Sequence, residues 1–407
     1  MATPTYTEAQ TLLTIEKALK ENYLPLWNNQ LGITPSALLA KIKKVPLKGD
    51  KIVAAAEVGL SGGFGYGAEG QATPTAGGVI FERFETRSKD MYSNVVISEK
   101  TVALANGNAG SIAPGLHSEM KGCYAAADWH VGRSLFMDGT GVLTKISALT
   151  EAGTTITVAN TKYLKEGIII DIYEGEPTNA AAAVQANGKA RRIKSIDRKN
   201  KKITLYGDTA TFKAGFITVQ NSFMREIDGL GAIFNENITS IYGVNKAENP
   251  FVKPVEVDAE GGISDSVITR ALRESKNVKN GNINMLLASD EAYDAYVEYL
   301  RTNNIRVEDS TYEIAGGFKA IKFVFGKEIV DIVNESFVPA GEIWGVDTNS
   351  LQMHWLDWRF AELQGGGIFN LMEQSSLYRA LLRNYGNLIC TNPGACVRIA
   401  NVDYVAG

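Results

Sequence analysis

Residues 59–78 read GLSGGFGYGAEGQATPTAGG and hold eight glycines and one proline. Within this stretch, Gly65, Gly67 and Gly70 match the G-x-G-x-x-G pattern of dinucleotide-binding turns. In that motif a helix follows the glycines, so that the pyrophosphate lies at the helix N-terminus. Here Pro74, two more glycines and a run of strand-forming residues follow instead. The stretch therefore predicts a loop and not a nucleotide cradle.

Strand-like segments flank this loop. KIVAAAEVGL (51–60) precedes it, and GGVIFERFETRS (77–88) and MYSNVVISEKTVAL (91–104) follow it. The following segments are rich in β-branched and aromatic residues, which favour strands. Because so many glycines cannot build a packed core, we predict an extended, flexible β-hairpin-like loop that projects from the body, within residues 46–100.

The residues before this region, 1–45, are predicted to form an arm. Thr7 and Gln10 make a T-x-x-Q capping box, which predicts the start of a short helix. The segment that follows is irregular but apolar and includes Leu24 and Trp27. An apolar arm with little local core needs a surface to lie on, either its own subunit or a neighbour.

The strongest helical pattern follows within residues 101–141. In GLHSEMKGCYAAADWHVGRSLFMDG (115–139), apolar residues recur at i, i+3 and i+4, and Gly139 lies just past the end. The pattern predicts a helix over 115–137, about 30 Å or more in length, which is long enough to serve as a structural spine.

Residues 142–222 change to short segments rich in Ile, Val and Thr, separated by polar turns at intervals of roughly 8–15 residues. This spacing predicts a small all-β barrel or sandwich inserted in the chain. The segments are TTITVAN (154–160), GIIIDIYEG (167–175), ARRIKSIDRKNKKITLYG (190–207) and GFITVQN (215–221).

The remainder is predicted to be mixed α/β over 223–360, with further strands over 361–407. Residues 264–278 form a helical pattern with Ser264 at the N-cap position, and 289–303 form a second amphipathic pattern. Between them, INMLLAS (283–289) is an apolar strand. Strand-like segments dominate the sequence after these helices.

Composition and titratable residues predict no catalytic residue, cofactor or metal. The net charge of −4 is mild, and no secretory signal or membrane span is visible, so we expect a soluble protein of a reducing cytoplasm with three reduced cysteines. His117 and His130 would lie about 20 Å apart on one helix, and His354 stands alone. Asp290, Asp294 and Glu298 share a helix face opposite the apolar side, which is typical of a solvated surface.

The most polarised stretch is KARRIKSIDRKNKK (189–202), with eight lysines and arginines against one acid, Asp197. Three interpretations stay open: a solvated hairpin, a contact with an acidic neighbouring subunit, or a site for nucleic acid. The stretch has no aromatic residue for base stacking. Arg191, Arg192 and Lys199 are the contact candidates.

The order of these parts resembles the major capsid protein of tailed bacteriophages, the Hong Kong 97-like fold. The glycine-rich loop is similar to the extended loop of that family, and 115–137 to its spine helix. Residues 267–304 look like the helix, strand and helix of its axial domain, and residues 315–356 like the return to its peripheral domain. The resemblance implies an α+β capsid fold with an inserted β-barrel.

The resemblance also implies a function. Subunits would assemble into pentamers and hexamers of an icosahedral shell around double-stranded DNA, in the cytoplasm of a bacterial host, and remain in the virion. The implied partners are other copies, packaged DNA held by weak non-specific contact, and separate scaffolding, portal and decoration proteins, but no membrane. The contact candidates in the arm and loop are Leu24, Trp27, Gly63, Gly65, Tyr66, Gly67 and Glu69. Because no lysine lies between Lys51 and Lys89, we expect no covalent cross-link from the loop tip.

Three alternatives remain. An encapsulin-type nanocompartment shell would share the fold and enclose protein cargo. A nucleotide-dependent enzyme would use the 63–70 glycine loop and bind NAD, FAD or ATP. A third alternative is another phage structural protein: the predicted barrel alone could pass for a decoration module, whereas the predicted spine helix argues against a tube, which would be nearly all β.

Overall fold

The computed structural model describes residues 36–59, 61–70, 72–99, 113–146, 152–178, 180–303, 313–314, 318–361, 370–372 and 375–403. The predicted arm helix, with Thr7 and Gln10, and the contact candidates Leu24 and Trp27 lie outside these residues. The chain divides into two compact units, each assembled from separate segments. Unit 1 contains 90–131 and 355–386, and unit 2 contains 36–89, 132–354 and 387–407.

Unit 1 is built around a long strand and a helix. The strand β22 (Leu377–Cys390) begins in this unit and pairs with β19 (Leu351–Trp355) and with three further strands, and the pairing with β20 and β21 is antiparallel. The helix α4 (Ala113–Ser134) confirms the helix predicted over 115–137. Its Cys123 and Ala127 pack in one cluster with Ala380 and Leu382 of β22. The partner strands are β4 (Lys89–Ser98), β20 (Arg359–Phe360) and β21 (Asn370–Leu371).

The predicted all-β insertion is a six-stranded sheet of unit 2. Its order is β5-β10-β7-β8-β9-β6, and every pair is antiparallel. The edge strands approach each other just after β6, where Ala159 N donates to Lys145 O of β5 over 2.9 Å. Full closure into a barrel stays a prediction. The strands are β5 (Val142–Ile146), β6 (Thr155–Thr157), β7 (Ile169–Glu174), β8 (Arg191–Asp197), β9 (Lys202–Leu205) and β10 (Gly215–Val219).

Unit 2 also contains a seven-stranded mixed sheet, in the order β13-β23-β18-β14-β17-β16-β15. Two pairs, β13 with β23 and β14 with β17, are parallel, and the other pairs are antiparallel. The mixed α/β pattern is therefore as expected. The strands are β13 (Val255–Asp258), β14 (Met285–Ala288), β15 (Glu313–Ile314), β16 (Phe318–Phe325), β17 (Glu328–Asn334), β18 (Ile343–Val346) and β23 (Val397–Ala400).

Two helices pack on this sheet, α6 (Asp265–Lys279) against β13 and β23, and α7 (Asp290–Thr302) against β14 and β17. Ser289 caps α7 as its hydroxyl accepts from Ala292 N. Ser264 occupies the N-cap position of α6 as predicted, although its side chain makes no cap hydrogen bond. Its hydroxyl pairs with that of Ser266 at 2.8 Å instead.

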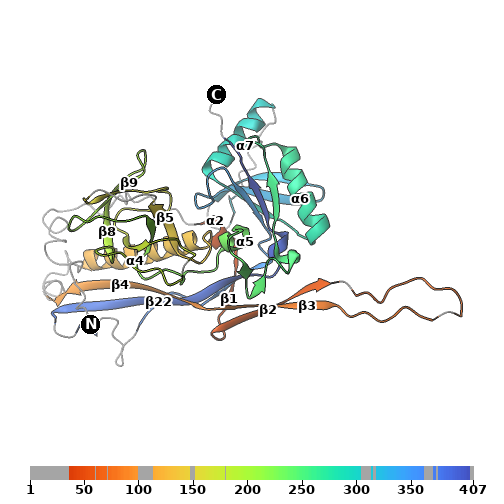
Figure 1. Ribbon diagram of the computed structural model, residues 1–407, viewed down its shortest axis with the longest axis horizontal. Coiled ribbons are helices and arrows are strands. Elements are labelled where there is room, and N and C mark those ends of the chain that lie inside the picture. The colour runs from red at the N-terminus through yellow and green to blue at the C-terminus, as the bar shows by residue number, and fades with distance from the viewer. Residues whose placement is uncertain are drawn as a thin grey trace. The chain divides into compact units, whose positions relative to one another are not determined.

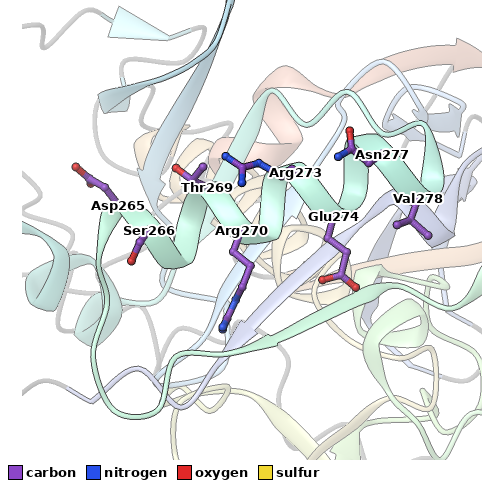
Figure 2. Close-up of a pocket in the computed structure, with 8 residues that line it drawn as sticks. All are labelled: Asp265, Ser266, Thr269, Arg270, Arg273, Glu274, Asn277 and Val278. Carbon is purple, nitrogen blue, oxygen red and sulfur yellow. The ribbon is translucent and has the colours of Figure 1, made fainter.

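The outer face of α6 carries a shallow depression of about 530 Å³ (Figure 2). Asp265, Thr269, Arg273 and Asn277 follow one row along the helix, and Ser266, Arg270, Glu274 and Val278 follow the other. Because every lining residue belongs to one helix, the depression is an open helix face and not an enclosed site.

The remaining described elements of unit 2 are short. α2 and β1 lie at the C-terminal end of the predicted arm, and β1 pairs with β19. β11 and β12 form a separate hairpin. These elements are α2 (Ala37–Lys41), β1 (Lys43–Pro46), α5 (Leu230–Phe234), β11 (Ser240–Ile241), β12 (Val244–Asn245), β19 (Leu351–Trp355) and the 3-10 turns η1 (Pro250–Val252) and η2 (Pro393–Ala395).

Candidate functional site: two exposed hairpins

The predicted hairpin around the glycine-rich loop is present in unit 2 (Figure 1). Strand β2 (Lys51–Gly59) pairs antiparallel with β3 (Ile80–Arg87), from Lys51 opposite Arg87 to Gly59 opposite Ile80. Between the strands, the described residues 61–70 and 72–79 hold no helix. The nucleotide-cradle interpretation therefore lacks the helix N-terminus that it needs.

The base of this hairpin is fixed in the core of unit 2. Phe84 of β3 is 0% exposed, and its ring lies 6.0 Å from that of Tyr242 and 6.5 Å from that of Phe251. Glu85 N donates to Tyr242 O over 2.9 Å. Aromatic burial of this kind is among the largest single contributions to a core.

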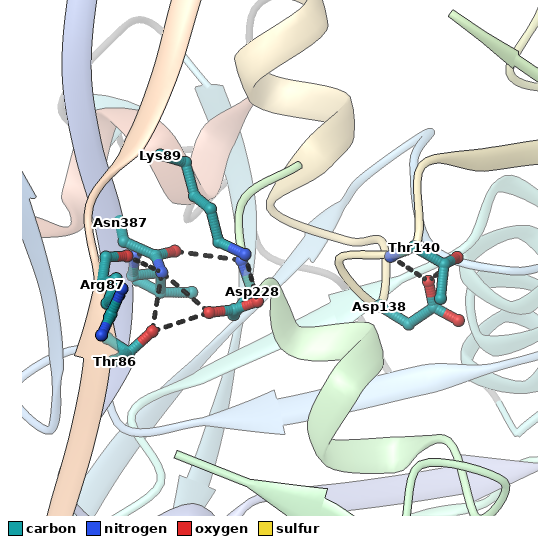
Figure 3. Close-up of polar contacts among 8 residues, drawn as sticks. Thr86, Arg87, Lys89, Asp138, Thr140, Asp228 and Asn387 are labelled. Atoms are coloured by element: carbon teal, nitrogen blue, oxygen red, sulfur yellow. Dashed lines mark hydrogen bonds and ion pairs between the residues drawn. The ribbon is translucent and has the colours of Figure 1, made fainter. Parts of the chain in front are cut away.

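A polar network secures the same base (Figure 3). Thr86 Oγ1 donates to Asp228 Oδ2 over 2.8 Å. Asn387, which is 0% exposed, donates from Nδ2 to Asp228 Oδ2 and to Arg87 O, each over 2.8 Å. Lys89 Nζ lies 3.3 Å from Asp228 Oδ1 and provides the opposite charge. The network links β3 to Asp228 and Asn387, which lie far along the chain, and no local sequence pattern predicted it.

A tight turn sits beside this network. Asp138 accepts from Thr140 N and from Asn235 Nδ2, each over 3.0 Å, and its bond to Thr140 is drawn in Figure 3. Gly139 adopts a φ of +83°, and a Cβ added there would lie 2.9 Å from Asp228 Oδ1. Both the left-handed backbone and the close approach require glycine at this position.

The two sides of the loop contact each other near the strands, but Gly67 at the tip has no such close neighbour. Ser61 Oγ donates to Gly77 O over 2.5 Å, so the two arms of the loop are joined near its root. A Cβ on Gly63 would lie 3.1 Å from Gly77 N, and one on Gly65 would lie 3.0 Å from the Pro74 ring. A Cβ on Gly67 would have no atom within 4 Å. The contact-candidate glycines thus lie along the loop, and Gly67 is the least constrained.

The tip presents aromatic residues to solvent. Phe64 is 80% exposed and Tyr66 is 96% exposed, and their rings meet edge to face at 5.3 Å. Glu69, in the same loop, is also exposed. Val53, Val79, Ile80 and Phe81 extend the exposed apolar surface along the hairpin. Large apolar side chains exposed together mark an interaction surface.

The charged run forms a second exposed hairpin from β8 and β9, with Asp197 opposite Lys202. We call residues 189–202 the cationic hairpin. Among its cations, Arg191 is half-buried and its Nη2 donates to Asp208 O over 2.6 Å. Arg198 Nη1 donates to Thr161 O over 3.2 Å. The other cations, Lys189, Arg192, Lys194, Lys199, Lys201 and Lys202, are exposed.

The single acid of the cationic hairpin is occupied within its own turn. Asp197 accepts from Asn200 Nδ2 over 2.7 Å and from Asn200 N over 3.0 Å. These hydrogen bonds, with the charge of Lys202, lower the pKa of Asp197. The charged run contains no aromatic residue, but Tyr206, just after β9, lies next to it. Its side chain is 53% exposed, and its ring centroid lies 5.9 Å from Lys194 Nζ.

Other candidate chemistry is sparse in the described part of the chain. Cys123, Cys390 and Cys396 form no disulfide, as predicted, and all three are buried. Asp290, Asp294 and Glu298 are exposed, which confirms the predicted solvated face. Among the described residues no group of His, Cys, Asp and Glu is arranged as metal ligands would be. No described helix has the length and apolar character needed to cross a membrane.

Comparison with known proteins gives the fold. No protein-family model and no curated protein matches the chain. It is similar to the capsid protein of cyanophage A-1(L), with a TM-score of 0.57, 10% identity, and coverage of 96% of this chain and 99% of that chain. It is also similar to the SrpI encapsulin of Synechococcus elongatus PCC 7942, with a TM-score of 0.50, 11% identity, and coverage of 98% and 97%. The chain therefore has the α+β fold of phage capsid and related shell proteins.

Proposed function

We propose that this protein is the major capsid protein of a tailed bacteriophage, which assembles into pentamers and hexamers of an icosahedral shell around double-stranded DNA. The observation that carries the proposal is the likeness to the cyanophage capsid protein over 96% of this chain and 99% of that one. Such coverage means that the likeness extends over nearly the whole chain and is not confined to one shared domain.

The two ends of the β2–β3 hairpin support the proposal independently. Its base is locked by Phe84 and Asn387, while its tip exposes Phe64 and Tyr66. A monomer gains nothing from holding these rings in water, whereas a neighbouring subunit that covers them gains apolar burial. Ordering the loop costs about 1–2 kcal/mol per residue in backbone entropy, which contacts between subunits must offset.

The proposed capsid function assigns a role to each part of the chain. Residues 1–45 are the arm, 46–100 the extended loop, 101–141 the spine-helix region, 142–222 the inserted domain, 223–360 the axial domain with the return to the peripheral domain, and 361–407 the C-terminal strands. Scaffolding, portal and decoration proteins would be separate partners, the packaged DNA would be held weakly, and assembly would take place in the host cytoplasm. No catalytic step belongs to this role.

Negative-stain electron microscopy of the purified full-length protein tests the proposal. We expect rings, sheets or hollow particles, with the protein alone or with its scaffold. Deleting 61–78 and joining the strands by a short turn should leave a folded subunit that no longer assembles. Wild-type protein that remains monomeric under every condition, scaffold included, would contradict the proposal.

A second candidate function is an encapsulin-type compartment, favoured by the likeness to the SrpI encapsulin over nearly the whole of both chains. Both functions predict closed shells, so the contents separate them. Particles purified from the native source and treated with nuclease should retain protected double-stranded DNA if the shell is a phage head. Small uniform particles that contain a protein and no DNA would favour the compartment.

A further inference from the structure

The cationic hairpin has no acidic partner elsewhere in the described part of its own chain. None of the ion pairs among the described residues includes a residue of 189–202. Its only acid, Asp197, is already engaged by Asn200. Positive charge concentrated on one exposed hairpin, in a chain whose net charge is −4, repels itself and attracts an acidic surface.

The same chain carries a complementary surface on α7. Asp290, Asp294 and Glu298 follow one another at intervals of four residues and are all exposed; we call them the acidic face of α7. Glu298 has a solvent-exposed contact of 3.5 Å with Arg301, which is a weak interaction. Among the described residues, no ion pair includes Asp294. Asp290 also interacts electrostatically with Lys162, so the least compensated charges of this face are those of Asp294 and Glu298.

The two surfaces match in length as well as in sign. Along α7, the eight-residue interval from Asp290 to Glu298 spans about 12 Å. In the hairpin, Lys202 lies opposite Asp197, three residues along β8 from Lys194. Three residues of a strand span about 10 Å, and the turn residues lengthen the cationic row further. A row of cations and a row of acids of similar length can pair at several points at once.

We propose that the cationic hairpin of one subunit docks on the acidic face of α7 of a second copy of this chain. The inference rests on the proposed function, since it names one contact within the shell. Because the two surfaces differ, the contact is heterologous and joins subunits head to tail, which is the geometry that generates rings. Exposed charge pairs of this kind set orientation and association rate, and salt weakens them.

The test uses two charge reversals in the full-length protein, Lys199→Glu with Lys201→Glu in the hairpin and Asp294→Lys with Glu298→Lys in α7. Each alone places like charges against each other, and we expect the protein concentration needed for assembly to rise roughly tenfold at low salt. A 1:1 mixture of the two variants should recover hexamers and the sheets that they form, because the two variants can alternate around an even-numbered ring, where every hairpin then meets a helix of opposite charge. Light scattering and electron microscopy measure assembly.

The mixing experiment is decisive, because one variant can restore the assembly of the other only through a contact between molecules. The matched control for the hairpin variant is Lys253→Glu with Lys327→Glu, which makes the same change in net charge at exposed lysines outside any ion pair of the described residues. Circular dichroism checks that every variant folds. An equal loss in the control, or a mixture that fails to recover, would overturn the contact.

Two further outcomes have distinct meanings. If the hairpin variant assembles like wild type but loses binding to a short DNA duplex in a gel-shift assay, the hairpin serves nucleic acid and the contact is overturned. Wild-type protein that never forms particles would contradict the proposed function, and this contact with it. Normal assembly of both variants would contradict this contact alone.

Discussion

The base and the tip of the β2–β3 hairpin belong to one continuous element but follow opposite rules. At the base, Phe84 is fully buried and Asn387 satisfies several polar groups at once. At the tip, Phe64 and Tyr66 contact each other but stand in solvent. The residues of the base are explained by the folding of this chain, whereas the residues of the tip are not.

This contrast separates stability from assembly. Substitutions at the base should lower the free energy of unfolding of the subunit, because its interactions are completed within the chain. Substitutions at the tip should leave that free energy unchanged and act only where another molecule covers the loop. The experiments below test the separation, beginning with the largest expected change in stability.

The largest effect is expected for Phe84→Ala. Removing a fully buried phenylalanine leaves a cavity beside Tyr242 and Phe251, which should cost about 3–5 kcal/mol of unfolding free energy. Urea denaturation of the subunit measures it. The matched control is Phe64→Ala at the tip, for which we expect no measurable change. Equal losses at the two positions would show that the tip also packs on its own subunit.

A second set of buried contacts holds Ser36 and Ala37, near the end of the predicted arm, against Glu335 of unit 2. Glu335, which is 3% exposed, accepts from Ser36 Oγ and from Ala37 N at the start of α2, each over 2.9 Å. Burial raises the pKa of Glu335 to about 7, against an ordinary value of 4.5, although these hydrogen bonds oppose the shift. Lys41 of α2 also pairs with Asp331 at 2.8 Å. Like the hairpin base, this junction is completed within the chain.

The raised pKa of Glu335 predicts a pH dependence with a definite sign. The folded state holds the proton more tightly than the unfolded chain, so the associated stability is fully present below about pH 4.5 and is lost as the pH rises to about 7. Glu335→Gln removes this titration. We expect the variant to gain stability relative to wild type over that window, by up to about 3 kcal/mol, in urea denaturation at several pH values. A difference that does not change with pH would contradict it.

A smaller loss is expected for Asn387→Ala. The substitution leaves Thr86, Asp228 and the carbonyl of Arg87 without their shared partner in a buried site, at a cost of about 1–3 kcal/mol. Thermal unfolding measures the change, and Asn282→Ala, at an exposed loop position, is the control. If the two variants unfold alike, the network does not secure the hairpin base.

Local patterns predicted the elements well. The periodicity over 115–137 gave a helix that the structure places at Ala113–Ser134, and the strand-forming runs around the glycines gave β2 and β3. The sequence predicted no helix after Gly70 and therefore no nucleotide cradle, and the described residues of the loop indeed contain no helix. Such predictions succeed because they depend only on residues close in sequence.

Contacts that depend on distant residues could not be predicted in this way. Asp228 lies 142 residues from Thr86 and 159 from Asn387, so no local pattern links them. The aromatic beside Lys194 comes from Tyr206 on the adjoining strand, outside the charged run. At Ser264 the position was right, but a neighbouring hydroxyl competed for the side chain. The tip residues Gly63, Gly65, Tyr66, Gly67 and Glu69 remain contact predictions, because the partner expected for them is another subunit.

The smallest change in stability, and the sharpest test of the contrast, is expected for Gly67→Val. A Cβ at this position meets no atom within 4 Å, and its φ lies outside the left-handed region, so the subunit should keep its unfolding free energy to within about 0.5 kcal/mol. Assembly should nevertheless weaken, because a loop that must bend across a neighbour loses freedom at its tip. Gly49→Val, also unobstructed but away from the loop, is the control for the added side chain. Normal particles from Gly67→Val would contradict this prediction and would mean that assembly does not depend on the flexibility that Gly67 gives the tip.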